Sequence, residues 1–556
     1  MLLIIGLDGA SPEIVERLAA QGHLPTLRAL MRHGVYGRLR SSPNCSPISA
    51  WASLLTGVNA GKHAAWGLSN LVSGSYDHRP PHSRMLRAPT LSQLLTERGL
   101  EAGTLFVPMT FPARESEWTT VSGWLCPSVD AEGFAWPARI ADIARRALEG
   151  QPLDVDLSGH AASGRIDQAL QEARAAMQAK RRLARELIGD RRWDMLAVNF
   201  IETDRVQRWL WHVTDRSHPA HRSDVHLRHA DCIEQIYIEA DQAVAELSGL
   251  LRPDDQLVVL STYGMGVRSG AGSCVAGVLE LLGMLQYFSA AGGARNRVAR
   301  RLELLMDGAC RGLHRLLPAR LAAMLPECRD PADLPAQHER DTGIDYERSA
   351  ALPAPGGHVY FNLEGQFPRG YVNQEVAARM ASQINQALAS AIDPANGRRP
   401  LESMLRREEV CAGPYLSRIP HLITRWRTDR VVTGLTVTAR DGRVRVVEPV
   451  RPGLPSGAPA PEGIFIAAGA PLRRAVRIEG ARLEDVTATA MHLCGERVPA
   501  YFDGRVLTEA ISPGALAERP VRKLDRDLPK IIEDADRAAR AASIVRAHLE
   551  SRSYAD

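Results

Sequence analysis

Apolar runs alternate with amphipathic, helix-like stretches through the first 265 residues of the chain. The first run, Met1–Leu7, ends at Asp8 and precedes a helical pattern that starts near Ser11. Further along, helical patterns at 170–187 and 233–251 lead into apolar strand patterns at 194–200 and 257–261. Repeated alternation of this kind predicts a mostly parallel central sheet with helices on both faces, so we expect an α/β fold.

The stretch Ser41–His63 is predicted to be a loop that runs into a short helix. Prolines keep its first part irregular, and Ser46 or Ser49 can cap the apolar run that follows. Unpaired N–H groups and the positive end of the helix dipole favour a bound anion at such a position. A capped helix without any ligand is the alternative interpretation.

The patterning divides the chain into four segments. We expect the first part of an α/β core at 1–265, a helical cap insertion at 266–340, the second part of the core at 341–510 and a C-terminal helical tail at 511–556. The cap contains a basic helical stretch at 294–325. Such a face could contact a membrane surface or a partner protein, whereas a solvated face on a cap helix is the alternative.

Composition sets limits on the function without identifying one. At 556 residues the chain can bury a large core, and 45% apolar residues is ordinary for a globular protein. The charges nearly balance, with 68 Lys and Arg against 64 Asp and Glu. Because the sequence also contains no recognisable nucleic-acid-binding motif, we expect no nucleic-acid partner.

The eight cysteines stand singly, without a CxxC pair, and this favours a reducing compartment. The apolar N-terminal run is short, has no basic flank and is needed as a strand, so we expect no signal peptide. No apolar run reaches the roughly 18 residues that a membrane span requires. We therefore expect a cytoplasmic protein without a membrane span, and leave a homo-oligomer open.

Three N-terminal motifs carry a family resemblance: LIIGLDGA at 3–10, GHLPTLRALMRHGVYGRLRS at 22–41 and AWASLLTGVNAGKH at 50–63. With weaker matches that follow in the same order to about residue 509, they resemble the type I phosphodiesterase/nucleotide pyrophosphatase family of the alkaline phosphatase superfamily. The resemblance implies an alkaline-phosphatase-like fold over nearly the whole chain, with a site at the carboxyl ends of the parallel strands.

Metal-dependent members of that family hold two divalent cations about 4 Å apart, which clamp the attacking and leaving oxygens. By the resemblance, Asp8 and Asp204 retain two of the six metal-ligand positions. The other four positions carry residue types that do not suit zinc or manganese: Arg208, Thr262, Tyr263 and Pro459. We therefore expect a divergent member without a metal cofactor; zinc or manganese held by unorthodox ligands is the alternative.

The family nucleophile is also displaced in this sequence. A Ser or Thr is implied nine residues before Thr56, and that register falls on Pro47, which has no hydroxyl. Ser46 lies one residue earlier and could serve if the loop carries an extra residue.

The retained and substituted residues predict a metal-free pocket. Arg208 places a permanent cation beside Asp204, and acid–base chemistry could use Asp8 or Asp204 as base and Tyr263 as acid. In the alternative, Arg208 only neutralises the leftover carboxylates and stabilises the fold. The predicted catalytic residues are Ser46, Asp8, Asp204, Arg208 and Tyr263. The predicted substrate-binding residues are Arg208, Thr262, Tyr263 and Lys62.

The resulting hypothesis is a protein with a dismantled dimetal site. It is either a metal-independent enzyme, for example of specialised metabolism, acting on a small or carrier-bound anionic substrate, or a pseudoenzyme. One alternative is an active metal-dependent phosphodiesterase or nucleotide pyrophosphatase with unorthodox ligands. A second is a binding or scaffold protein that uses the basic 294–325 segment.

Overall fold

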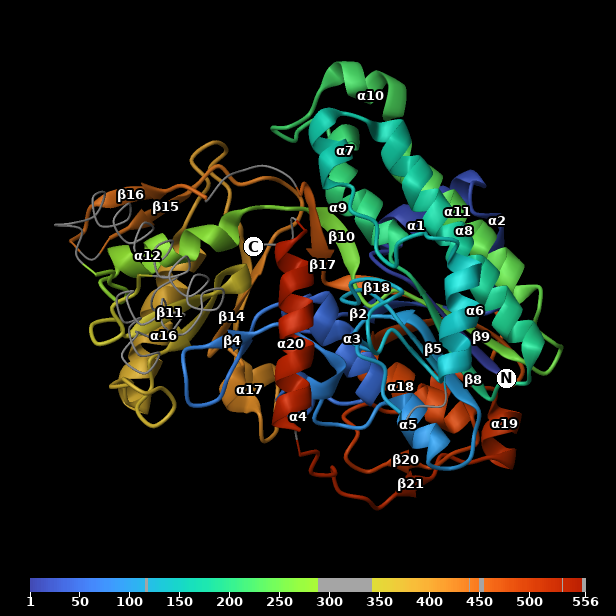
Figure 1. Ribbon diagram of the computed structural model, residues 1–556. Helices are drawn as coiled ribbons and strands as arrows, with labels where there is room; N and C mark the ends of the chain where they lie inside the picture. Colours follow the sequence, from blue (N-terminus) through green and yellow to red (C-terminus); the bar gives the residue numbers. More distant parts are fainter. Residues whose placement is uncertain (116–118, 289–342, 440, 450–454, 533, 553–556) are drawn as a thin grey trace, which may run out of the picture.

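The computed structural model describes residues 1–115, 119–288, 343–439, 441–449, 455–532 and 534–552. Its centre is a nine-stranded, mostly parallel sheet (Figure 1). The α/β class with a large central sheet is therefore confirmed. In spatial order, the strands are β19 (Val476–Arg482), β2 (Val35–Arg40), β18 (Glu462–Gly469), β9 (Gln256–Leu260), β1 (Leu2–Leu7), β8 (Met195–Phe200), β5 (Ala102–Val107), β6 (Thr119–Ser122) and β7 (Ala135–Trp136).

The three central strands have the near-continuous apolar sequences of strands covered on both faces. β1 pairs in parallel with β8 on one side and with β9 on the other. All residues of β1 and β8 are buried. Because the three strands run in the same direction, the residues that follow Leu7, Phe200 and Leu260 meet at one edge of the sheet.

Helices cover the sheet on two sides (Figure 1). One group contains α1 (Pro12–Gln21), α2 (Pro25–His33), α6 (Ala138–Leu148), α8 (Ile166–Asp190), α9 (Glu202–Thr214) and α11 (Cys232–Ser248). The other contains α3 (Pro47–Thr56), α5 (Leu91–Thr96) and α18 (Leu483–Leu493). The helices predicted at 170–187 and 233–251 thus correspond to α8 and α11, with shifted ends.

A second, smaller core is built from residues between 271 and 437, joined by two residues from 71–76. Its antiparallel sheet has the order β11 (Ala351–Ala354), β12 (His358–Phe361), β14 (Leu422–Trp426) and β13 (Leu401–Arg406). The helices α12 (Val275–Leu281) and α16 (Gln374–Ser390) pack in the same cluster.

The strand-rich pattern at 341–510 contributes strands to two different sheets. Of the strands in that range, β18 and β19 join the main sheet, whereas β11 to β14 form the second sheet. A strand pattern reveals which residues extend but not which neighbour they pair with, so the sequence did not separate these two sheets. The basic 294–325 segment lies outside the described residues, and the four-segment division stays a prediction.

The predicted C-terminal tail at 511–556 contains two helices, α19 (Pro513–Glu518) and α20 (Ala535–Glu550). α20 begins where the Asp534 side chain accepts a hydrogen bond from the N–H of Arg537. Residues 525–532 between them carry no helix, so the tail is helical only in part. Asp534 is a favourable N-cap, so the helix starts at this residue. Among the described helices, none combines the length and the apolar character that crossing a membrane demands.

Candidate functional site

The loop after β1 occupies the carboxyl edge of the sheet and is fixed from several sides. The Thr203 hydroxyl donates to the carbonyl of Asp8 at 2.5 Å, and the Gln207 amide donates to the carbonyl of Gly9 at 2.9 Å. Gly9 has a φ of +74°, and a Cβ there would lie 2.7 Å from the Met265 side chain and 3.1 Å from the backbone of α9. Glycine is therefore required for β1 to turn so close to α9.

The Asp8 carboxyl group is fully buried between α3 and β8. It accepts hydrogen bonds from the Trp51 indole at 2.9 Å and from the Asn199 amide at 3.1 Å. Burial, with a smaller contribution from the charge of Asp204, raises the pKa of Asp8 to about 7. The two donors that hold the Asp8 carboxyl group are thus neutral, whereas the donors to the neighbouring Asp204 include cations.

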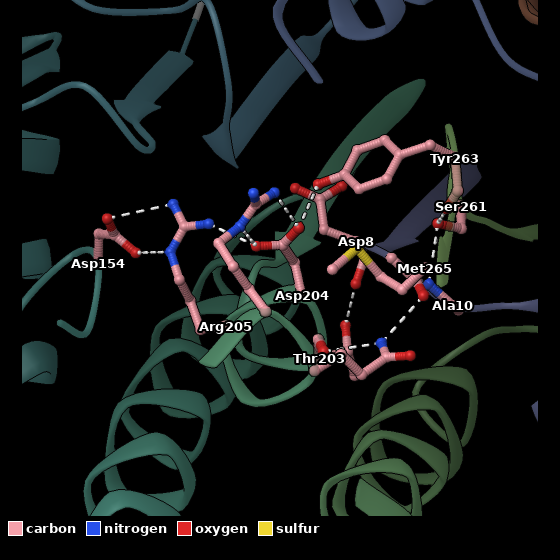
Figure 2. A network of polar contacts seen from close by, with 12 residues as sticks. Asp8, Ala10, Asp154, Thr203, Asp204, Arg205, Ser261, Tyr263 and Met265 are labelled. Carbon is pink, nitrogen blue, oxygen red and sulfur yellow. Dashed lines mark hydrogen bonds and ion pairs between the residues drawn. The ribbon is translucent and has the colours of Figure 1, made fainter. Parts of the chain in front are cut away.

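Asp204 lies in the first turn of α9 and is surrounded by cations (Figure 2). Arg208, one helical turn further on, donates from Nε at 2.9 Å and from Nη2 at 2.8 Å. Arg205 donates to the same carboxylate at 2.5 Å, and the Tyr263 hydroxyl donates to it at 3.2 Å. Four donor contacts therefore fill the acceptor positions of this single carboxylate.

Arg205 extends the network to a third carboxylate. Its Nε donates to Asp154 at 2.6 Å and its Nη2 at 3.2 Å, a two-point ion pair buried from solvent. The same guanidinium lies 5.0 Å from the centre of the Trp124 ring. Paired charges that also make hydrogen bonds can remain ionised in a buried site, whereas an isolated one would be strongly destabilising.

The electrostatics follow from this geometry. Burial alone would raise the pKa of Asp204, but the charges of Arg208 and Arg205 outweigh it and hold the pKa below its ordinary value. For Tyr263, burial and the nearby carboxylates of Asp204 and Asp8 raise the pKa well above the usual range. Tyr263 is thus a neutral hydrogen-bond donor at physiological pH, and Asp204 is an ionised acceptor.

Thr262 and Pro459 are the other two residues predicted at family metal-ligand positions. Thr262 is fully buried, and its hydroxyl has no hydrogen-bond partner among the described residues. Pro459 lies in β17 (Gly457–Ala460), opposite Met265 of β10 (Gly264–Val267). A threonine hydroxyl is a weak substitute for a carboxylate, and proline offers no side-chain ligand at all.

These residues do not fit a pair of divalent cations. The guanidinium of Arg208 occupies two contacts on Asp204 where a metal would need free lone pairs, and it carries a positive charge itself. Within the described ranges, no group of three or more His, Cys, Asp or Glu side chains is arranged to hold a metal ion. Asp8 and Asp204, the two carboxylates at the predicted ligand positions, are by themselves a poor ligand set for zinc.

Ser46 and Lys62, the two predicted site residues on the stretch 41–63, have different surroundings. Ser46 occupies the N-cap position of α3, with Pro47 at the first helical position, but its hydroxyl makes no capping bond. Ser49, the other candidate cap, lies inside the helix and is buried. The Lys62 ammonium contacts the Asp503 carboxylate at 2.5 Å and the Tyr501 carbonyl at 2.9 Å, so it is engaged with the segment after α18.

The structure brings together Asp8, Asp204, Arg208 and Tyr263, as the sequence predicts, and adds residues that the sequence did not reveal. Trp51, Asn199 and Asp154 contact the network from α3, β8 and an irregular segment. Arg205 had one signal in the sequence, its position directly after Asp204. Its burial in α9 is seen only in the structure. No signal in the sequence identified Asp154, because 51 residues separate it from Arg205, with which it pairs.

Three comparisons relate this chain to known proteins. A sequence model described as type I phosphodiesterase / nucleotide pyrophosphatase matches residues 2–431. Similar solved structures include phosphonoacetate hydrolase from Sinorhizobium meliloti 1021 in complex with phosphonoacetate, with a TM-score of 0.47, 16% identity, and coverage of 88% of this chain and 95% of that chain. Human ectonucleotide pyrophosphatase / phosphodiesterase 5 has a TM-score of 0.42, 11% identity, and coverage of 89% and 95%. A comparison with curated proteins found no match.

Proposed function

Because the chain belongs to the type I phosphodiesterase / nucleotide pyrophosphatase family, we propose that it is a metal-independent member that binds an anionic small molecule or carrier-bound group without hydrolysing phosphodiesters. In this proposal, a protein-made network of cations replaces the two metal ions of its relatives. The observation that carries it is the Asp204 carboxylate, whose acceptor positions are filled by Arg205, Arg208 and Tyr263.

Arg208 is the member of the network that supports anion binding. Its side chain keeps 17% of its surface exposed, whereas Asp204 is fully buried. Nε and Nη2 are directed to Asp204, and Nη1 has no hydrogen-bond partner among the described residues. A guanidinium fixed in this way presents a permanent charge to an oxyanion at little further entropic cost.

Ser46 supports the same location. Trp51 joins α3 to Asp8, and Ser46 stands five residues before it. At about 1.5 Å of rise per residue, the N-terminus of α3 is therefore about 7.5 Å along the helix from Trp51. The free N–H groups and the dipole of that helix end favour an anion there.

Metal-independent acid–base catalysis by Asp8 or Asp204 with Tyr263 has less support than binding. Asp8 and Asp204 have no exposed surface, and Tyr263 has 1%. Each also has protein partners that a reacting substrate would have to displace. A scaffold role for the 294–325 segment concerns residues outside the described ranges and gains no support here.

Metal content together with phosphodiesterase activity tests the proposal. Protein exposed to zinc and manganese and then dialysed should retain far less than one metal equivalent per chain. It should hydrolyse bis(p-nitrophenyl) phosphate only at the background rate. A matched variant that restores family-type ligands, Arg208→His with Thr262→Asp, Tyr263→His and Pro459→His, should retain more metal than the wild type. Two equivalents in the wild-type protein, with turnover that a chelator abolishes, would refute the proposal.

The variant Arg208→Gln tests the proposed anion binding separately. Inorganic phosphate titrated calorimetrically at low ionic strength should bind the wild type at least tenfold more tightly than this variant. Arg443→Gln, an exposed arginine of a surface hairpin, is the control and should bind like the wild type. Equal affinity for wild type and Arg208→Gln would contradict the binding role.

A further inference from the structure

A separate cavity of about 540 Å³ is lined by residues near the carboxyl ends of three helices and near the β20–β21 ribbon. The ribbon lies at the bottom of Figure 1. The ribbon pairs β20 (Val498–Pro499) with β21 (Lys523–Leu524). The helices are α5, α18 and α19 (Pro513–Glu518). None of the network residues around Asp204 lines this cavity. Its volume is within the range of small-molecule sites, about 300–1,000 Å³.

The charged lining of the cavity is dominated by arginine: Arg98, Arg497, Arg519 and Arg522 stand against Glu496 and Glu518. Arg98 is neutralised by Glu496, with Nε 2.7 Å from the carboxylate. Arg497, Arg519 and Arg522 form no ion pair with any side chain in the described part of the chain. Three guanidiniums thus share one concave space with a single remaining carboxylate.

The carboxyl ends of the helices can balance only part of the positive charge of the three unpaired arginines. α5, α18 and α19 all present their carboxyl ends here, and each end is equivalent to about half a negative charge at most. Arg98 already donates to the Leu94 carbonyl of α5 at 2.8 Å, which leaves the ends of α18 and α19. Arginines placed to cap those ends would account for one or two of the side chains but not for all three. A concave surface lined by charges of one sign focuses their field and raises the local concentration of ions of opposite sign.

Local geometry holds Arg519 against the cavity wall. Gly495 has a φ of +86°, and a Cβ at that position would lie 3.2 Å from Nη1 of Arg519. The absence of a side chain therefore lets the guanidinium lie against the turn that ends α18. The His492 ring is 5% exposed on the same wall, and burial together with the charge of Arg519 lowers its pKa below the ordinary value. A neutral imidazole adds a hydrogen-bonding group without adding charge.

We propose that this cavity binds a small, multiply charged oxyanion through Arg497, Arg519 and Arg522. The guanidinium fork matches the two oxygens of a phosphate or a carboxylate equally well, so the shared chemistry is an anion with at least two such groups. The site is distinct from the Arg208 site and does not depend on the function proposed for it.

Calorimetric titration of the full-length protein with inorganic pyrophosphate and, separately, with citrate tests this site and its preferred class of anion. In Arg519→Ala/Arg522→Ala, the affinity for the tighter of the two ligands should fall at least tenfold. The charge-matched control is Arg473→Ala/Arg474→Ala, two exposed arginines that do not line the cavity, and its affinity should equal that of the wild type. Tighter binding of pyrophosphate identifies phosphate compounds as the ligand class, and tighter binding of citrate identifies polycarboxylates.

Two results would overturn the assignment. If neither ligand binds, or if the control pair loses affinity equally, the arginines only cap helices or attract anions nonspecifically. If binding survives in Arg519→Ala/Arg522→Ala but disappears in Arg208→Gln, the anion occupies the network site instead. A melting temperature measured for each variant ensures that any lost affinity belongs to a folded protein.

Discussion

The network around Asp204 and the cavity near β21 use the same residue type in opposite ways. In the network, Arg205 is 1% exposed and its guanidinium contacts two carboxylates. In the cavity, Arg519 and Arg522 are exposed and have no ion pair among the described residues. An arginine that is buried with its counter-charge contributes to the folded state, whereas one left exposed and unmatched in a concavity is available to a ligand.

The two regions therefore differ in how accessible their arginines are to a ligand. The network lies in the protein interior, and the Arg208 side chain is its partly exposed member. The cavity has no counterpart in the motifs at 3–10, 22–41 and 50–63 that carry the family resemblance. Substitutions in the network should therefore change mainly the stability of the fold, and substitutions in the cavity should change mainly the affinity for anions.

The largest effect is expected for Arg205→Met. The substitution removes the cation that pairs with both Asp154 and Asp204 and leaves two buried carboxylates undercompensated. Breaking a buried pair in this way costs about 3–5 kcal/mol, so the free energy of unfolding in urea should fall by that amount. Arg522→Met is the exposed control. A loss below about 1 kcal/mol would mean that the network does not stabilise the fold.

Asp8→Asn should change the pH dependence of stability. The pKa of Asp8 in the folded state, about 7, is above its ordinary value of 3.8. The stability linked to its protonated form is therefore present at about pH 4 and lost as the pH rises through about 7. Asparagine cannot ionise, so the stability of the variant relative to the wild type should improve by about 2–4 kcal/mol between pH 4 and pH 8.

Thermal or urea unfolding of both proteins across that pH range measures this difference. A constant difference would show that the folded and unfolded states bind the Asp8 proton equally well. Thr110→Val, which removes a buried hydroxyl that does not titrate, serves as a variant whose difference from wild type should not depend on pH.

Tyr263→Phe should have a smaller effect, because it removes one donor of four from Asp204. A hydrogen bond to a charged acceptor contributes about 1.5–3 kcal/mol, and the remaining guanidinium contacts should keep the loss near the lower end. Tyr371→Phe, at 50% exposure, is the matched control. Urea unfolding measures both variants, and an unchanged stability for Tyr263→Phe would contradict the hydrogen bond.

The smallest effect on stability is expected for Arg519→Ala/Arg522→Ala. Surface substitutions without burial usually change stability by less than about 0.5 kcal/mol, so the unfolding midpoint in buffer should stay close to that of the wild type. In pyrophosphate or citrate, the wild type should gain more stability than the variant, since a ligand that binds the folded state more tightly raises its stability further. A large loss in buffer alone would assign the two arginines to the interior packing after all.

The sequence was most informative where chemistry depends on neighbours in the chain. The apolar run ending at Asp8 identified β1 and placed a carboxylate at its carboxyl end. The spacing of Asp204 and Arg208 in one helix predicted their contact, because residues four apart lie on the same helical face. The motif register also assigned residues 262, 263 and 459 to family ligand positions, and this assignment stays a prediction.

Contacts between distant segments could not be predicted in this way. The sequence did not indicate that Trp51 reaches Asp8, that Asp154 pairs with Arg205, or that the arginines at 98, 497, 519 and 522 share one cavity. The sequence by itself thus determined the α/β class and the family, since these depend on local periodicity and on motifs of neighbouring residues. The tertiary structure alone decided which charges are buried together and which are left unmatched, because burial and pairing depend on how separate elements pack.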